Sequence, residues 1–254
     1  MPNKLVHMLH YEDSIPDFAQ DMNKVLGATY IVSRTVDVQV EIITLVNKGG
    51  CDMAHMHYIN QYIEKNTAAS AENSVVLFLK DSPRTKQFLH VSLRWRKLSE
   101  MIFYASRGEF ICGIKSRCHT SVFHDSDVLK KYILTNYIRT GDQIATGEDF
   151  NASKYKDLGD FVKKELDWSF PEDEDLIEVC YGGTFAVPAS KLLSDPRLEK
   201  DLKRFEQILS DGPAMSIAEH FAERLWAGFL ANPLNEADSA ILQDLMESFA
   251  GKNK

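Results

Sequence analysis

The sequence predicts an α/β protein, with a mixed sheet flanked by helices and with C-terminal helices in a single domain. Apolar runs of strand length alternate with segments of helical periodicity through the first half of the chain. Such alternation is typical of a parallel or mixed sheet with helices packed on it. The chain has 254 residues, of which 44% are hydrophobic, and this is enough for one domain with a substantial core.

The first half of the chain supplies most of the expected strands. Apolar runs rich in β-branched and aromatic residues indicate strands, and apolar residues three or four positions apart indicate helices. The expected strands are 5–9, 29–33, 38–46, 74–79 and 110–114, and the expected helices are 15–26, 52–64, 87–105 and 127–137.

The second half begins with a polar, weakly patterned segment. Residues 139–175 end in an acidic run and predict a loop or insertion, which a short helix at 155–166 interrupts. A buried strand is expected at 179–187. The remaining elements are helices at 197–209, 217–230 and 236–249, so that residues 235–254 form the C-terminal helix and tail of one domain spanning residues 1–254.

Composition argues against several classes of protein. The net charge of −8 disfavours general nucleic-acid binding through a basic surface. No apolar run approaches the roughly 20 residues that span a bilayer, and the amino terminus lacks a signal-peptide core, so we expect a cytoplasmic protein without a transmembrane segment. The four cysteines show no Cys-x-x-Cys spacing and are expected to be reduced thiols, mostly packing groups: Cys51, Cys112, Cys118 and Cys180.

One part of this acidic chain is basic. Residues 80–117 contain nine Lys and Arg against three acids. A basic segment inside an acidic protein suits a phosphorylated small molecule. For single residues such as Arg94, Arg96 and Lys97, the alternative is the polar face of an ordinary helix.

The segment Cys-Tyr-Gly-Gly-Thr-Phe-Ala-Val at 180–187 is the most informative stretch of the sequence. It places Gly182 and Gly183 side by side in the expected buried strand, between Tyr181 and Thr184. Glycines inside a strand indicate that a ligand or another backbone approaches closely. We therefore expect a binding function here.

A second segment, Ile-Ala-Glu-His-Phe-Ala-Glu-Arg-Leu-Trp at 217–226, begins an apolar helix with a polar cluster. Glu219, His220 and Glu223 recur at helical spacing, which favours a site. Two alternatives remain open. Glu219 suits a capping box with Ser216, and Glu223 with Arg224 suits an ordinary solvated face.

Together these two segments resemble a family of glycosyltransferase-like proteins of the GT-A superfamily. Two further pieces match the same pattern, a strand ending in Asn-Lys-Gly at 47–49 and a buried strand at 75–79 that runs into Asp81. The resemblance extends over residues 38–232. It implies a GT-A-like, Rossmann-like fold and transfer of a sugar from a nucleotide-sugar donor to an acceptor. A catalytically silent binding or scaffold protein of the same fold is the alternative.

The resemblance also implies a divalent cation, Mn²⁺ or Mg²⁺, bridging the donor phosphates at Asp81, with His220 as a further ligand. The usual second acid is absent, because position 83 is proline. Lys80 and Arg84 are therefore candidates to stabilise the diphosphate instead, and a turn or helix cap is the alternative role for Asp81. Asp125 and Asp127 form a literal Asp-x-Asp and are the second candidate metal site, although helix capping is the favoured interpretation.

The same resemblance assigns the catalytic base to Glu219, with Glu223 one turn later. Contacts to the donor are expected at Asn47, Lys48 and Gly49, which precede a helix. His55 and His57 in that helix point about 200° apart and cannot hold one metal. Tyr181, Gly182, Gly183 and Thr184 complete the predicted substrate site.

Three other enzyme classes fit poorly. A zincin needs a second histidine where this chain has Arg224. The glycine motifs of dinucleotide-binding and P-loop proteins do not occur in the sequence.

Overall fold

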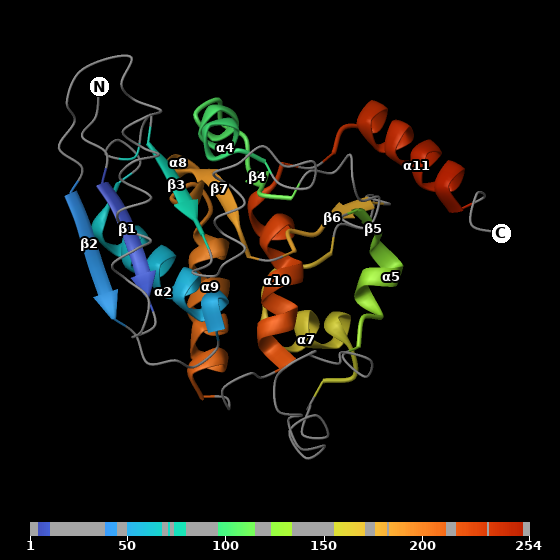
Figure 1. The fold of residues 1–254 in the computed structure, drawn as a ribbon. Helices are drawn as coiled ribbons and strands as arrows, with labels where there is room; N and C mark the ends of the chain where they lie inside the picture. Colours follow the sequence, from blue (N-terminus) through green and yellow to red (C-terminus); the bar gives the residue numbers. More distant parts are fainter. Residues whose placement is uncertain are drawn as a thin grey trace, which may run out of the picture.

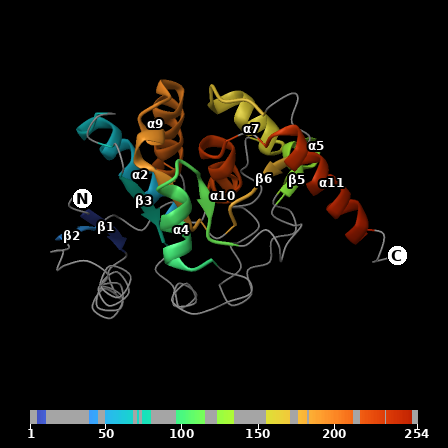
Figure 2. The same cartoon turned by 90° about the horizontal axis from the view of Figure 1, so that it is seen from above.

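The computed structural model has a mixed α/β architecture (Figures 1 and 2). It describes residues 5–10, 39–44, 50–67, 71, 74–79, 96–114, 123–133, 155–170, 176–181, 183–211, 217–232 and 234–250. The strands in these ranges are β1 (Leu5–His10), β2 (Gln39–Thr44), β3 (Val75–Phe78), β4 (Ile111–Cys112), β5 (Phe123–Asp125), β6 (Leu176–Glu178) and β7 (Phe185–Pro188). The helices are α2 (Gly50–Lys65), α4 (Leu98–Ala105), α5 (Ser126–Lys130), α7 (Leu158–Glu165), α8 (Ala189–Leu192), α9 (Pro196–Asp211), α10 (Ile217–Leu230) and α11 (Glu236–Ala250).

The strands pair in three groups within the described residues. β1 and β2 are parallel, with Leu5 opposite Gln39. β7 lies between β3 and β4 and is antiparallel to both, whereas β5 pairs antiparallel with β6. The predicted α/β class is therefore confirmed, whereas the described parallel and antiparallel pairs lie in separate groups and do not form one mixed sheet. All four residues of β7 are buried, as expected for the central strand of its group.

The prediction of a single strand at 179–187 is wrong. β6 ends at Glu178 and β7 begins at Phe185, and the two strands belong to different pairing groups. Between them the chain turns, because Gly183 has φ of +56° and its N–H bonds the Cys180 carbonyl at 3.3 Å. Positive φ suits glycine and is incompatible with a continuous strand. Gly182 lies outside the described residues.

Two predicted helices differ from the structure. In 87–105 the described part becomes helical only at Leu98, because Arg96 instead bonds the Gly113 carbonyl through its backbone N–H at 2.8 Å. In 127–137 the helix α5 ends at Lys130. Two residues later the carbonyl of Tyr132 accepts the N–H of Leu158 at 3.0 Å, so this part of the chain pairs with the start of α7. The helices predicted at 52–64, 155–166, 197–209, 217–230 and 236–249 are confirmed.

The core lies where α2, α7, α9 and α10 meet β7. Its largest fully buried side chains include Trp226, Phe161, Phe185, Phe205 and Phe221. Helix α10 packs against α2, α9 and β6, and Figure 1 shows α11 extending away from this body. Residues 155–170, inside the segment expected to be a loop or insertion, supply several core side chains. None of the described helices is long and apolar enough to cross a membrane.

Cys112 of β4 and Cys180 are joined by a disulfide, with Cα atoms 5.4 Å apart. The expectation of reduced thiols is therefore wrong for this pair. Sequence spacing gave no sign of the pairing, because folding brings β4 against the residue that precedes Tyr181. The bond ties that residue to the sheet around β7.

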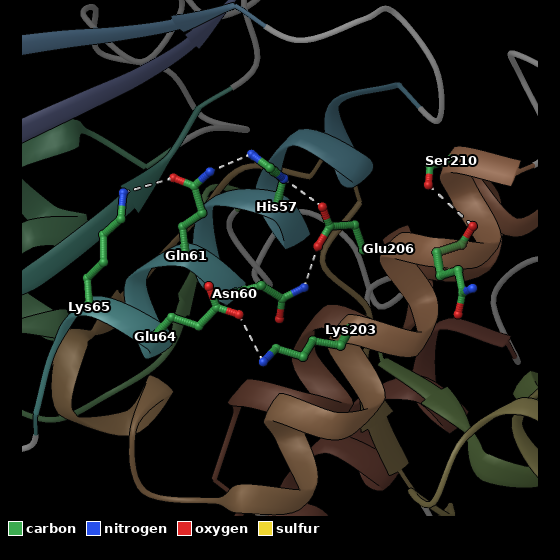
Figure 3. Close-up of polar contacts among 9 residues, drawn as sticks. His57, Asn60, Gln61, Glu64, Lys65, Lys203, Glu206 and Ser210 are labelled. Atoms are coloured by element: carbon green, nitrogen blue, oxygen red, sulfur yellow. Dashed lines mark hydrogen bonds and ion pairs between the residues drawn. The ribbon is translucent and has the colours of Figure 1, made fainter.

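A series of side-chain hydrogen bonds joins helices α2 and α9 (Figure 3). Glu206 of α9 bonds the Nδ1 of His57 and the Nδ2 of Asn60, each at 2.6 Å. Gln61 bonds His57 Nε2 at 2.8 Å and accepts from Lys65 at 3.3 Å. Both ring nitrogens of His57 thus have hydrogen-bond partners in these two helices. We interpret this cluster as structural, because it holds α2 against α9.

Candidate functional site

The candidate site is built around Arg224, in the middle of α10. Most of the surrounding helix is apolar and buried, and Arg224 is itself only 7% exposed. The guanidinium carbon lies 3.7 Å from the centre of the Tyr132 ring and 5.5 Å from the centre of the Tyr181 ring. The aromatic rings therefore hold a cation that would otherwise lie in water.

Helix α10 also supplies polar groups around this cation. Arg224 Nη1 donates a hydrogen bond to the His220 carbonyl at 2.8 Å, one turn earlier. Glu223 Oε2 lies 3.7 Å from the same nitrogen, which is an ion pair but longer than a hydrogen bond. The Glu223 side chain is 18% exposed. A partly exposed carboxylate therefore lies beside a buried guanidinium.

Tyr181 connects this cation to the β5–β6 pair. Its hydroxyl lies 2.9 Å from His124 Nε2, and the two rings meet edge to face. Burial raises the pKa of Tyr181, the positive charge of Arg224 opposes that rise, and the negative charge of Glu223 adds to it. The charges of Arg224 and Glu223 on α10 therefore both act on the tyrosine hydroxyl.

Glu178 lies at the end of β6, opposite Phe123 of β5. Burial raises its pKa from 4.5 to about 7, and the charge of Arg96 opposes the rise. Arg96 is directed elsewhere, donating to the Cys112 carbonyl and to Glu100, each at 3.0 Å. The strand leading to Tyr181 therefore carries a carboxyl that titrates near neutral pH.

The structure brings together three of the residues that the sequence predicted. Tyr181, Glu223 and the main chain of His220 all lie around Arg224. Thr184 and Gly183 are buried, and the Thr184 carbonyl accepts the N–H of Gly113 at 2.8 Å. Outside the described residues lie Asn47, Lys48, Gly49, Lys80, Asp81, Arg84, Gly182 and the side chain of Glu219.

The metal site predicted at Asp81 and His220 stays a prediction, because Asp81 is among the residues not described. In the described part of the chain, no three His, Cys, Asp or Glu side chains lie where they could hold a metal ion. Asp125 caps α5, accepting the Val128 N–H at 3.0 Å, and Asp127 pairs with Lys130. The capping interpretation of Asp125 is confirmed.

Sequence reasoning missed the central role of Arg224 and did not consider Tyr132 or His124. One signal was available, since Arg224 directly precedes residues 225–230, the wholly apolar end of the helix. No comparable pattern singles out Tyr132 or His124, because a turn and a short strand bring them in from distant parts of the chain.

His55 and His57 diverge as expected. His55 is 4% exposed and its ring centre lies 4.9 Å from that of Phe78, inside the aromatic core. His57 faces α9 instead. Neither histidine belongs to the group around Arg224.

The groups gathered here suit a ligand that carries negative charge. A guanidinium binds oxyanions, a neighbouring carboxylate accepts a proton, and a tyrosine bonded to a histidine exchanges one. Comparisons with models of protein families, with curated proteins and with solved structures found no match.

Proposed function

We propose that the protein transfers a sugar from a nucleotide-sugar donor to an acceptor, with the acceptor site between Tyr181 and the first half of α10. The fold proposed with this activity is GT-A-like. Both proposals begin from the sequence resemblance, and the geometry around Arg224 supports the location of the site.

One observation carries the proposal. The sequence predicts that the glycine-containing segment at 180–187 and the start of α10 form one acceptor site, although residues 188–216 separate them in the chain. In the structure the Tyr181 ring lies 5.5 Å from the Arg224 guanidinium, and the charge of Glu223 acts on the Tyr181 hydroxyl. The proximity of an acid and an aromatic hydroxyl from these two segments supports the proposal, because an acceptor site needs a base and a contact surface.

The proposed chemistry assigns Glu223 or Glu219 as the base, since both fall on one face of α10 at a spacing of four residues. The carboxylate takes the proton from the acceptor hydroxyl. The acceptor oxygen then bonds the anomeric carbon as the bond from that carbon to the phosphate oxygen breaks. The nucleoside diphosphate leaves with the electron pair. A divalent cation at Asp81, or Lys80 and Arg84, would stabilise that leaving group.

The test is a screen of nucleotide sugars for release of nucleoside diphosphate, with Mn²⁺ or Mg²⁺ and without either. We expect Glu223→Gln or Glu219→Gln to lower kcat by about 10²–10⁴ while leaving nucleotide affinity nearly unchanged. Glu236→Gln, on the exposed start of α11, is the matched control. Equal rates for all three variants would remove both carboxylates from the role of base.

A binding protein of the same fold is the second candidate, and the proline at position 83 favours it, because the second acid of the usual metal motif is missing. This candidate predicts that a nucleotide raises the melting temperature without any turnover. Release of nucleoside diphosphate by the wild-type protein, lost in Glu223→Gln, would reject it.

A further inference from the structure

We propose that Arg224 is an anion-binding residue and that its guanidinium takes a phosphate group of the ligand. This inference rests on the proposed function, because it names the group that binds the phosphates of the donor. It adds a binding residue that the sequence does not assign, since the sequence pattern indicates only an ordinary solvated face for Arg224.

The first argument is the number of unused donors. A guanidinium has five N–H groups. Among the described residues Arg224 makes one hydrogen bond, to the His220 carbonyl, and its buried Nε has no partner. Buried donors are nearly always satisfied, and an exception at a charged group points to a missing partner.

The second argument is incomplete neutralisation of charge. Described groups close to Arg224 come from three directions: Glu223 and His220 from α10, Tyr132 from the segment after α5, and Tyr181 from the turn before β7. Glu223 is the acid among them, at 3.7 Å and partly exposed to solvent. Solvent weakens such a pair, so a buried positive charge retains much of its attraction for a second anion.

The third argument is orientation. The guanidinium carbon lies 3.7 Å from the centre of the Tyr132 ring, which covers one face of the cation. The N–H groups of a guanidinium point outward in its plane, so a ring stacked on one face does not occupy them. A ligand can therefore bind at the edge of the guanidinium. That edge matches two oxygens of a phosphate, a geometry that lysine cannot reproduce.

The chemistry favours a phosphate over a carboxylate. Half-buried Tyr181 lies next to the cation and adds a hydroxyl, which bonds His124 and can also meet an oxyanion. The local excess of Lys and Arg in residues 80–117 gives the sequence a basic segment suited to phosphorylated compounds. Inorganic pyrophosphate is therefore the probe, with acetate as the carboxylate comparison.

The experiment is calorimetric titration of the full chain with pyrophosphate and, separately, acetate. We expect pyrophosphate to bind the wild type more tightly than acetate, and Arg224→Lys and Arg224→Met to weaken it by about 10- to 100-fold. Arg107→Met is the control, because Arg107 also contacts an aromatic ring, that of Phe103 at 4.7 Å, but is exposed. It should bind pyrophosphate like the wild type.

Folding of each variant is checked by near-ultraviolet circular dichroism. If Arg224→Met does not fold, the wild type labelled with ¹⁵N-arginine still tests the proposal. Pyrophosphate should then shift the Nε–Hε resonance of Arg224, identified by its absence from the spectrum of Arg224→Lys.

Two results would overturn the inference: unchanged pyrophosphate affinity in a folded Arg224 variant, or no pyrophosphate binding by the wild type. Because pyrophosphate contains no sugar, these results are independent of turnover. Absence of sugar transfer with intact, Arg224-dependent pyrophosphate binding would reject the transferase alone.

Discussion

The indole Nε1 of Trp226 donates a hydrogen bond to Oδ1 of Asp52 at 2.7 Å, and both side chains are buried. The bond joins α10 to the first turn of α2. It therefore ties the helix of the predicted acceptor site to the helix that follows the predicted donor loop.

Replacing Trp226 with phenylalanine removes this donor and part of a fully buried ring. We expect Trp226→Phe to lower the free energy of unfolding by about 2–4 kcal/mol, measured by urea denaturation. Trp168→Phe is the control, because Trp168 is only half-buried, and it should cost clearly less. Equal losses for the two variants would show that the bond to Asp52 adds little stability.

Glu178 should make stability depend on pH. Its pKa is about 7 in the folded protein against 4.5 for the ordinary group, so between these values the native state keeps a proton that the unfolded state has lost. Stability from this group is complete below pH 4.5 and falls as pH rises to about 7, by roughly 3 kcal/mol in total.

Glu178→Gln cannot lose that proton. The variant should therefore match the wild type near pH 4.5 and exceed it in stability at pH 8, as measured by urea denaturation across the range. Glu109→Gln, at an exposed position, is the comparison. A constant difference between the Glu178→Gln and wild-type curves from pH 4.5 to 8 would contradict this prediction.

Gly228 marks a close approach of α10 to Trp168. A Cβ at this position would lie 2.9 Å from Trp168 Cζ2. Helix propensity alone predicts that Gly228→Ala is stabilising by roughly 1 kcal/mol. The contact with the ring reverses the sign, and we expect a loss of about 1–3 kcal/mol in chemical denaturation. In a Trp168→Ala background the same change should become neutral or stabilising, and a loss that persists there would have another cause.

The disulfide between Cys112 and Cys180 predicts a covalently linked pair of peptides. Alkylation in denaturant without reductant, followed by proteolysis and mass spectrometry, should recover that pair. Reducing the protein first should separate it. The two residues are 68 positions apart, so the chain-entropy argument gives a loss of about 4 kcal/mol for the Cys112→Ala, Cys180→Ala double variant. Full alkylation of both cysteines without reductant would exclude the bond.

The sequence predicted best where periodicity is long. Helices α9 and α10 follow directly from apolar positions that recur every three or four residues, and their bounds agree closely with the predicted ones. The strand prediction failed around Gly183 because an apolar run with glycines is compatible with a strand or with a turn. The choice depended on which strands β6 and β7 would pair with, and that pairing involves distant residues.

The candidate site divides in the same way. The sequence by itself predicted Tyr181 from the glycines beside it, and His220 and Glu223 from the polar cluster at the start of the helix. Only the tertiary structure placed Tyr132 against Arg224 and His124 against Tyr181. Local patterns record which face of an element is buried, whereas contacts between elements depend on how the whole chain packs. For that reason the sequence determined the long, strongly periodic helices and part of the candidate site, and packing decided which cation lies at its centre.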